Sequence, residues 1–342
     1  MPTPKVYVVI LNWNGWADTI ECLESLLRST YQNFQVVLCD NSSSDGSVER
    51  IKSWAAGELS LYLDKGNPLR KLSFPAVLKP LPCLHIRAGE EFDAGTGEGY
   101  PLVLIETGGN LGFAGGNNVG LRFALARDDF DFVWLLNNDT VVAPDALASM
   151  VEAMERRPDA GFCGAMLLNY SPSETVQSYG GSTYNRWLAA PRSFGAGETL
   201  GAAIDEDSIS KRLDYVAGAS MMVPKRLLIE IGLMCEDYFL YFEEIDWFQR
   251  ARSRFRIAFS SRSRVYHKEG ASIGSSSVAV TRSKMSDFYI VRNKILFTRK
   301  FFPLLLPVVI LSTLAVAANR IRRGQADRIG TVFKGVLEGM RG

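Results

Sequence analysis

The order of apolar and polar segments constrains the fold of this chain more than any other feature. Mostly apolar runs occupy residues 6–11, 34–40, 102–106 and 132–136, and helical patterns lie between them, for example at 118–127. Strands that alternate with helices at this rhythm predict a parallel, doubly wound sheet with helices on its faces. We therefore expect an α/β protein.

Polar residues stand where each of these runs ends. Asn12 follows the first run, Asp40 ends the second, a Gly-rich segment (107–120) follows the third and Asp139 follows the fourth. Asn and Asp are also common turn residues, so each position alone shows little. Open parallel sheets bind ligands outside the carboxyl ends of their strands. The four positions together therefore predict one binding site.

The Gly-rich segment reads T-G-G-N-L-G-F-A-G-G-N-N-V-G. Glycines allow a ligand to approach the backbone, and a helix N-terminus after them favours a phosphate group. The spacing is neither G-x-G-x-x-G nor that of a P-loop, which weakens the dinucleotide and Walker interpretations. A tight turn explains the segment as well as a phosphate site does.

An acidic and aromatic segment follows later in the chain, F-L-Y-F-E-E-I-D-W-F-Q-R-A-R at 239–252. Glu243 and Glu244 fall in the first turn of a predicted helix, and Asp246 follows them; the helix dipole favours negative charge there. Carboxylates packed among aromatic rings lose water and repel one another, and both effects make a carboxylate a better base. A helix start with solvated carboxylates remains the alternative.

The chain has two histidines, and they give different predictions. His267, in R-V-Y-H-K-E-G, is a candidate second ligand to a divalent ion held by Asp139, since imidazole suits Mn²⁺ better than Mg²⁺. His85 lies in a Gly- and Pro-rich stretch (57–100) without metal-like neighbours, where a surface or packing role is expected. We interpret this stretch as an insertion.

Composition indicates the compartment and the kind of partner that the protein has. The five cysteines form no C-x-x-C pair, which argues against a disulfide framework and favours a reducing compartment. The formal net charge of +1 conceals a basic C-terminal part with 19 Lys and Arg against 4 Asp and Glu from Trp247 onward. This charge predicts an anionic partner, either nucleic acid or a membrane surface. The apolar start of the chain is too short for a signal peptide.

The segment 301–318 favours the membrane. It is 18 residues long, uncharged and flanked by basic clusters at both ends. This length is at the lower limit for crossing a bilayer, and Pro303 and Pro307 would kink its start. We therefore expect a segment that lies in the membrane interface rather than one that spans it; a buried core helix is the remaining alternative.

Six motifs in order give a specific resemblance: V-I-L-N-W-N-G, C-D-N-S-S-S-D-G-S, N-L-G-F-A-G-G-N-N-V-G, L-L-N-N-D-T, Y-V-A-G-A-S-M-M-V-P and the acidic segment above. The chain resembles the family 2 glycosyltransferases, and within them the rhamnosyltransferase-like branch. The resemblance implies a GT-A fold, a Rossmann-like, mostly parallel sheet flanked by helices, over residues 1–295 with the insertion at 57–100. Residues 296–342 would then form a membrane-associated helical region.

The resemblance also assigns roles to single residues. Asp40 matches the acid that contacts the nucleotide, and Asn12 and Asn14 match the loop below it. Asp139 matches the surviving carboxylate of a D-x-D motif, whose first position is Asn137 here, and Glu244 takes the place of the catalytic base, which is usually Asp. His267 aligns with a histidine that completes the metal site in some relatives. The candidate donor-binding residues are Asn12, Asn14, Asp40, Asn41, Gly115, Asn117, Asn138 and Asp139; the candidate metal ligands are Asp139 and His267; the candidate bases are Glu244, Glu243 and Asp246.

The sequence therefore predicts an inverting glycosyltransferase that uses Mg²⁺ or Mn²⁺ and a nucleotide-sugar donor, with dTDP-rhamnose as the first choice and UDP-sugars as the second. We expect a cell-envelope glycan or lipid-linked acceptor, no nucleic acid, and a location at the cytoplasmic face of the cytoplasmic membrane. Two alternatives remain. One is a non-catalytic, membrane-associated nucleotide-sugar-binding module, and the other, less favoured, is a sugar nucleotidyltransferase.

Overall fold

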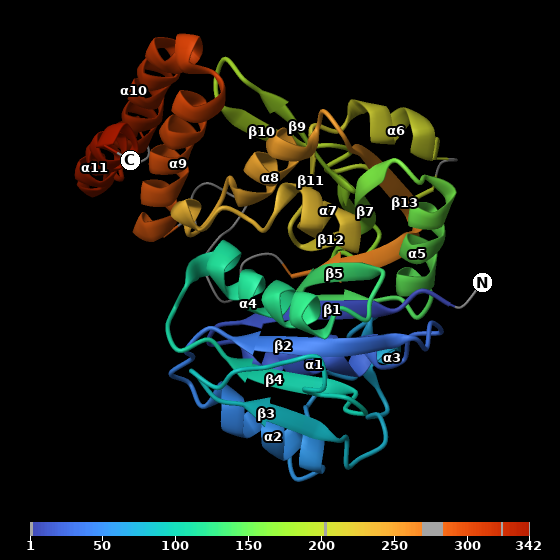
Figure 1. Ribbon diagram of the computed structural model, residues 1–342. Helices are drawn as coiled ribbons and strands as arrows, with labels where there is room; N and C mark the ends of the chain where they lie inside the picture. Colours follow the sequence, from blue (N-terminus) through green and yellow to red (C-terminus); the bar gives the residue numbers. More distant parts are fainter. Residues whose placement is uncertain (1–2, 202–203, 269–282, 323, 342) are drawn as a thin grey trace.

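The computed structural model describes residues 3–201, 204–268, 283–322 and 324–341. A ten-stranded sheet crosses the molecule, with helices on both of its faces and a layer of helices at one side (Figure 1). In sheet order, the strands are β3 (Cys83–Ile86), β4 (Leu102–Glu106), β2 (Phe34–Asp40), β1 (Val6–Asn12), β5 (Phe132–Asn137), β12 (Ser220–Pro224), β7 (Ala160–Asn169), β13 (Arg256–His267) and β6 (Thr140–Val142), and β8 (Val176–Tyr179) pairs with β7.

Helices connect these strands. They are α1 (Trp16–Leu26), α2 (Ser47–Ala56), α3 (Arg70–Ser73), α4 (Gly112–Arg127), α5 (Ala146–Arg156), α6 (Glu206–Arg212), α7 (Lys225–Ile231) and α8 (Glu243–Ala251), with a short 3-10 turn η1 (Glu236–Tyr238) before α8. A second sheet of three strands contains β10 (Ala190–Ser193), β9 (Gly181–Asn185) and β11 (Tyr215–Val216).

The first half of the main sheet confirms the predicted doubly wound arrangement. The strands β3, β4, β2, β1 and β5 are parallel neighbours. Alternate side chains of β1 enter opposite cores, since Tyr7 and Val9 pack with α4 while Val6, Val8 and Ile10 pack with α1 and α2. This burial on both faces explains why the strands read as continuous apolar runs.

The second half of the sheet is mixed: β13 runs parallel to β7, as expected for a mostly parallel sheet, and the other pairs there are antiparallel. β12 runs antiparallel to β5 and to β7, and β6 runs antiparallel to β13. The chain between β7 and β12 forms β8 to β11 and the short α6, so no single helical crossover forces a parallel return. The α/β fold itself is confirmed.

The Gly-rich segment is part loop and part helix. Gly116 and Gly120 lie one turn apart in α4, on the side that contacts β1. A Cβ atom at Gly116 would lie 2.4 Å from Leu11 Cδ1, and one at Gly120 would lie 2.5 Å from Val9 Cγ1. These two glycines therefore let α4 pack closely on the sheet, which neither the phosphate interpretation nor the tight-turn interpretation predicted.

The insertion at 57–100 contains α3 and contributes β3 to the edge of the sheet. Glu24 of α1 holds it in place, because its carboxylate accepts hydrogen bonds from Val77 N at 2.7 Å and Lys79 Nζ at 3.3 Å. His85 in β3 pairs with Glu106 at 2.7 Å.

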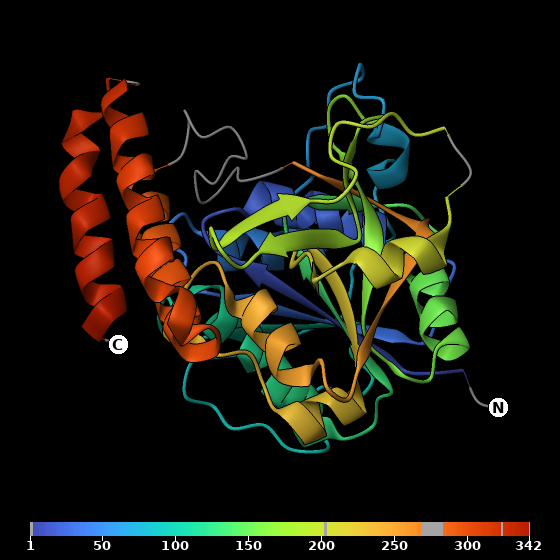
Figure 2. The ribbon, with the colours of Figure 1, turned by 90° about the horizontal axis from the view of Figure 1, so that it is seen from above.

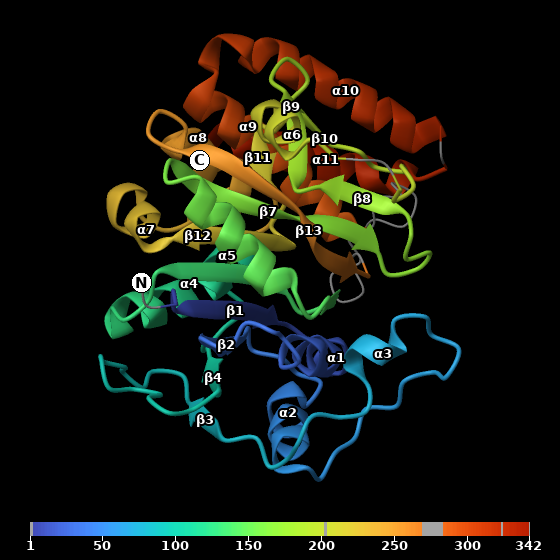
Figure 3. The same cartoon turned by 90° about the vertical axis from the view of Figure 1, so that its right-hand side faces the viewer.

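Three helices form a layer at one side of the molecule (Figures 2 and 3). They are α9 (Lys284–Phe301), α10 (Leu306–Arg322) and α11 (Ile329–Arg341), joined by the 3-10 turns η2 (Pro303–Leu305) and η3 (Ala326–Arg328). Arg320 and Arg328 both pair with the buried Asp287 of α9. The helix α9 runs through residue 296, where the sequence placed a domain boundary.

Candidate active site

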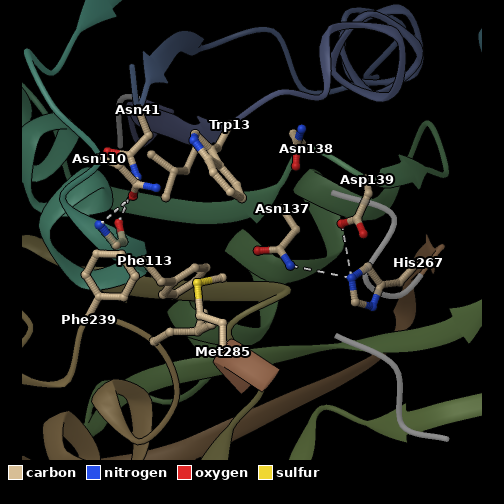
Figure 4. Close-up of a pocket in the computed structure, with 13 residues that line it drawn as sticks. Trp13, Asn41, Asn110, Phe113, Asn137, Asn138, Asp139, Phe239, His267 and Met285 are labelled. Atoms are coloured by element: carbon tan, nitrogen blue, oxygen red, sulfur yellow. Dashed lines mark hydrogen bonds and ion pairs between the residues drawn. The ribbon is translucent and has the colours of Figure 1, made fainter. Parts of the chain in front are cut away.

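A cavity opens at the carboxyl ends of β1, β2 and β5, as the sequence predicted for a binding site (Figure 4). Its walls come from these strand ends, the start of α4, the loop before α8, the end of β13 and the start of α9. The lining residues are Leu11, Trp13, Asn41, Asn110, Gly112, Phe113, Asn137, Asn138, Asp139, Phe239, Leu240, His267 and Met285.

Asn12 and Asp40 lie beneath this cavity and not in its wall. Asn12 is fully buried and donates from Nδ2 to Asp40 Oδ1 at 2.7 Å and to Ser43 Oγ at 3.1 Å. The other oxygen of Asp40 accepts from Ser43 N at 2.9 Å. Asn14, at φ +51°, accepts from Ser44 N at 2.7 Å. This network joins the loops after β1 and β2, so these three residues shape the floor of the site.

Asn41 continues the network into the wall of the cavity. Its Nδ2 donates to Asn110 Oδ1 at 3.0 Å and to Gly112 O at 3.2 Å, and its Oδ1 accepts from Leu111 N at 3.0 Å. Gly112 has φ +71°, and a Cβ atom there would lie 2.2 Å from Phe239 O. The loop before α4 can therefore approach the loop before α8 only because residue 112 is glycine.

Gly115 and Asn117 lie inside α4, away from the cavity wall. Asn117 is buried and donates to Phe113 O at 2.9 Å, one turn earlier in the same helix. A Cβ atom at Gly115 would lie 2.7 Å from Leu111 Cβ. Their expected part in donor binding stays a prediction, and these contacts give both residues a role in the geometry of the helix.

Asp139 and His267 meet at one end of the cavity, where β5 and β13 end. His267 Nε2 lies 3.1 Å from Asp139 Oδ1, and both side chains are almost completely buried (Figure 4). Gln177 Oε1 of β8 accepts from His267 Nδ1 at 2.8 Å, which places a proton on Nδ1. Asn137 Nδ2, at 3.4 Å, faces Nε2 as a donor. The same ring nitrogen, Nε2, faces the Asp139 carboxylate.

This arrangement fits a divalent cation with two protein ligands. No group of three or more His, Cys, Asp and Glu side chains within the described ranges could hold a metal by itself. Mg²⁺ commonly binds one or two carboxylates together with phosphate oxygens of a substrate. A histidine whose second nitrogen is fixed by an amide acceptor is also a usual metal ligand. The donor set present thus suits a cation that is shared with a diphosphate.

Asn138 lines the cavity between the Asp139–His267 pair and the network of Asn12 and Asp40. Its Nδ2 donates to Thr19 Oγ1 at 3.0 Å and lies 3.3 Å from Asn12 Oδ1. Asn138 therefore connects the Asp139 end of the cavity to the network beneath it.

Glu243 and Glu244 begin α8, in an apolar environment. Burial raises the pKa of both carboxyls, and the charge of Glu244 raises the pKa of Glu243 further. The backbone N–H of Gly218 donates to Glu244 and opposes part of the shift in its pKa. Glu243 Oε2 is buried and has no hydrogen-bond partner among the described residues. Raised pKa values of neighbouring carboxyls are characteristic of general acids and bases.

Asp246 has different surroundings. It is fully buried and pairs with Arg250 Nε at 2.7 Å and with Lys300 Nζ at 2.6 Å, and Tyr238 donates its hydroxyl to it at 3.0 Å. Lys300 belongs to α9, so Asp246 joins α8 to the helical layer. Both carboxylate oxygens of Asp246 are therefore already occupied by partners. The geometry thus favours Glu243 and Glu244 over Asp246 as bases.

Glu243 and Glu244 do not line the cavity themselves, and Phe113 and the loop before α8 connect them to it. Phe113 lines the cavity, and its ring lies close to Gly218, beside Glu244 Oε1. Phe239 and Leu240 of the loop are also part of the cavity wall. The backbone of this loop is unusual, with positive φ angles at Phe239, Tyr241 and Phe242.

Several residues of the site were not predicted from the sequence. They are Trp13, Asn110, Phe113, Phe239, Leu240 and Met285 in the cavity wall, and Gln177 behind His267. Asn110 and Phe113 belong to the Gly-rich motif and Trp13 to the first motif, so their neighbours in sequence were a signal for them. Gln177 and Met285 carry no such signal, since only the fold brings them to the site.

Comparison with solved structures defines the class of protein. The mannosyltransferase PcManGT from Pyrobaculum calidifontis, solved with GDP-Man and Mn²⁺, is 13% identical, with a TM-score of 0.53 over 98% of this chain and 87% of that one. GalNAc-T7, solved with UDP, GalNAc and Mn²⁺, is 13% identical, with a TM-score of 0.52 over 86% of this chain and 51% of that one. The fold is therefore that of the GT-A glycosyltransferases.

The sequence then gives the family. Residues 7–68 and 90–197 match the family described as Glycosyl transferase family 2, and the unmatched residues between them fall within the predicted insertion. The low-salt glycan biosynthesis hexosyltransferase Agl10 of Haloferax volcanii is 27% identical over 153 residues, which are 44% of this chain and 46% of that protein. The match thus spans less than half of this relative. The chain carries a family 2 glycosyltransferase domain.

Proposed function

We propose that this protein transfers a sugar from a nucleotide-sugar donor to an acceptor hydroxyl with inversion at the anomeric carbon. The observation that carries the proposal is the position of two chemically different groups, one in the wall of a cavity and one next to that wall. Asp139 and His267 form one end of its wall. Glu244 lies beside Phe113, which belongs to the same wall.

The first group suits the leaving diphosphate. A divalent cation, Mg²⁺ or Mn²⁺, bound at Asp139 and His267 would neutralise charge on the diphosphate as it leaves. The chain's own part is to hold these two ligands in place, through Gln177 and through the end of β5. The Mn²⁺ in the complexes of PcManGT and GalNAc-T7 supports a divalent ion of this kind.

The second group suits the acceptor. Glu244 would take the proton of the acceptor hydroxyl. At the same time the hydroxyl oxygen forms a bond to the anomeric carbon, and the bond from that carbon to the diphosphate breaks. One displacement inverts the configuration and needs no carboxylate nucleophile, by analogy with inverting glycosidases. The raised pKa of Glu244 brings it closer to the value that a general base needs near neutral pH.

The donor is proposed from similarity. The rhamnosyltransferase-like motifs favour dTDP-rhamnose, and the UDP and GDP-Man in the complexes of relatives of the same fold keep UDP- and GDP-sugars as the next choices. We further propose that the acceptor is a cell-envelope glycan or a lipid-linked sugar at the cytoplasmic face of the membrane. The basic, apolar C-terminal residues support this location.

The experiment is a screen of nucleotide sugars for release of nucleoside diphosphate by the purified full chain, with Mg²⁺ or Mn²⁺ and with membrane lipid extract as the acceptor source. We expect release with one donor class, dependent on the metal and the extract. Absence of release with every donor and both metals would overturn the proposal.

A second candidate is a nucleotide-sugar-binding module without catalysis. Asn137 in place of the first carboxylate of the D-x-D motif favours it, since one metal-binding carboxylate is lost. Donor binding measured by calorimetry without release of diphosphate would support this candidate.

A further inference from the structure

The exposed face of α10 and of the turn before it is apolar as far as Ile321, among the side chains that the structure describes there. These exposed side chains repeat at helical spacing; they are Pro303, Leu304, Pro307, Val308, Leu311, Leu314, Ala315, Ala318 and Ile321. Leu304 is 92% exposed, Leu311 64% and Leu314 51%. A helix on the surface of a water-soluble domain normally has its polar side outward. An apolar stripe of this length marks a docking surface.

The opposite face of α10 is fixed to the protein. Ser312 accepts a hydrogen bond from Lys294 Nζ of α9 at 3.1 Å, and Arg320 pairs with Asp287 of the same helix. Val309 is fully buried, and Thr313 is 2% exposed. The segment Pro303–Arg322 is long and apolar enough to cross a membrane, yet α10 has this polar and charged inner face. Crossing the bilayer would break these contacts or bury them in lipid at high cost.

The next helix adds a second exposed stripe. Phe333, Leu337 and Met340 of α11 lie at helical spacing and are 43–59% exposed, with the exposed cations Lys334 and Arg341 beside them. The turn between β9 and β10 lies beside this helical layer and carries Trp187, 55% exposed (Figures 1 and 2). Tryptophan is favoured at the level of lipid headgroups.

Charge indicates what covers this face. Residues 283–342 contain 11 Lys and Arg against 3 Asp and Glu. Of the three acids, Asp287 is buried and paired with arginines. Two copies of the chain that met at this face would bring like charges together, whereas an anionic lipid surface neutralises them. An apolar stripe bordered by cations is the pattern of a helix that lies in the membrane interface.

We infer that α10 and α11 form a monotopic docking face for an anionic lipid bilayer, with α10 lying in the interface and not crossing it. The inference deepens the membrane location proposed above. It is tested by lipid binding alone, so it can fail or succeed whether or not the protein transfers sugar.

The first experiment is cosedimentation of the full chain with vesicles of phosphatidylcholine, with and without phosphatidylglycerol. We expect binding that is strong only with phosphatidylglycerol. Leu311→Glu combined with Leu314→Glu should reduce binding by about tenfold or more, because two carboxylates then face anionic lipid. Ile229→Glu is the matched control, since Ile229 is a 67% exposed aliphatic residue of α7 and should bind as the wild type does. Equal binding by all variants, or no binding by the wild type, would overturn the inference.

Two further measurements do not depend on the folding of that variant. In the first, Lys334→Gln combined with Arg341→Gln should weaken binding to phosphatidylglycerol vesicles, and unchanged binding would contradict the charge argument. In the second, a tag placed after Gly342 of the wild type should be digested by protease from the side of the catalytic domain. A protected tag would show that α10 crosses the bilayer.

A different outcome would assign the face to a second copy of the chain. In that case the wild type would be a dimer in solution and would not bind lipid, and Leu311→Glu combined with Leu314→Glu would dissociate the dimer.

Discussion

Asn293 of α9 donates its side-chain amide to the carbonyl oxygen of Leu240, at 2.7 Å, in the loop that lines the cavity. The same amide lies 2.8 Å from Tyr238 O and 3.0 Å from Tyr241 O, and Asn293 is fully buried. One side chain of the helical layer thus holds the loop that leads into Glu243 and Glu244. The helical layer therefore supports the active site, in addition to any contact that it makes with a membrane.

Replacing Asn293 should therefore affect turnover. Asn293→Leu keeps the branched shape of the side chain but leaves buried carbonyl oxygens without a donor, which costs about 2–4 kcal/mol of stability. We expect kcat to fall by about tenfold or more, with a smaller change in donor KM, because the carboxylates of α8 lose their position. Asn33→Leu is the matched control, since Asn33 also donates to a backbone carbonyl but lies at the opposite end of β2. Loss of stability with unchanged kcat per folded molecule would show that Asn293 only supports the fold.

Glu244→Gln should separate catalysis from binding. The amide keeps the shape of the side chain but accepts no proton, so we expect diphosphate release to fall by about 10²–10⁴-fold while donor affinity measured by calorimetry stays the same. Asp246→Asn should behave differently. It breaks buried pairs with Arg250 and Lys300 and should lower the free energy of unfolding by about 3–5 kcal/mol. If Glu244→Gln keeps full turnover, the base is a neighbouring carboxylate, and Glu243→Gln is the next variant to measure.

The pKa of Glu243 predicts how stability depends on pH. Burial, and then the charge of Glu244, raise this pKa well above its ordinary value of 4.5. A carboxyl whose pKa is higher in the folded chain takes up protons on folding, so its contribution to stability is present at low pH and is lost as the pH rises through the folded value. Glu243→Gln should therefore unfold at higher urea concentration than the wild type at about pH 8, and this advantage should disappear near about pH 4. Glu58→Gln, on the surface, is the control for the substitution itself. A constant difference at all pH values would contradict the raised pKa.

The sequence predicted those parts of the fold that depend on local pattern. The strands β1, β2, β4 and β5 were found from their apolar runs, and the position of Asp139 at the edge of the sheet followed from the end of β5. The antiparallel direction of β12 could not be found in this way, because strand direction is set by pairing with β5 and β7 and not by the residues of the strand.

Only part of the site could be predicted, because the sequence shows local pattern but not the contacts that the fold creates. Residues at strand ends were identified, yet Asn12 and Asp40 form the buried floor and not the wall, because short polar side chains at neighbouring strand ends bond to each other first. Asn293 is 53 residues from Leu240, and Gln177 is 90 residues from His267. No local pattern connects such pairs, since only the folded chain brings them together.

The contact between Gln177 and His267 predicts how metal affinity depends on a residue outside the metal site. Gln177 fixes the proton of His267 on Nδ1, so Gln177→Leu should free the imidazole to rotate and to change tautomer, while Asp139 keeps its place. Loss of such a partner weakens metal binding by about 10–100-fold, so the Mn²⁺ concentration needed for half-maximal diphosphate release should rise by that factor. Binding of Mn²⁺ measured by electron paramagnetic resonance with the nucleoside diphosphate present should weaken in parallel.

Gln32→Leu is the control, since Gln32 is a surface glutamine beyond the other end of β2, and this change should alter neither quantity. If Gln177→Leu and the wild type need the same Mn²⁺ concentration while His267→Ala needs more, the histidine binds the metal without help from Gln177. If His267→Ala is also unchanged, Asp139 holds the cation without the imidazole, and the assignment of His267 as a ligand is wrong.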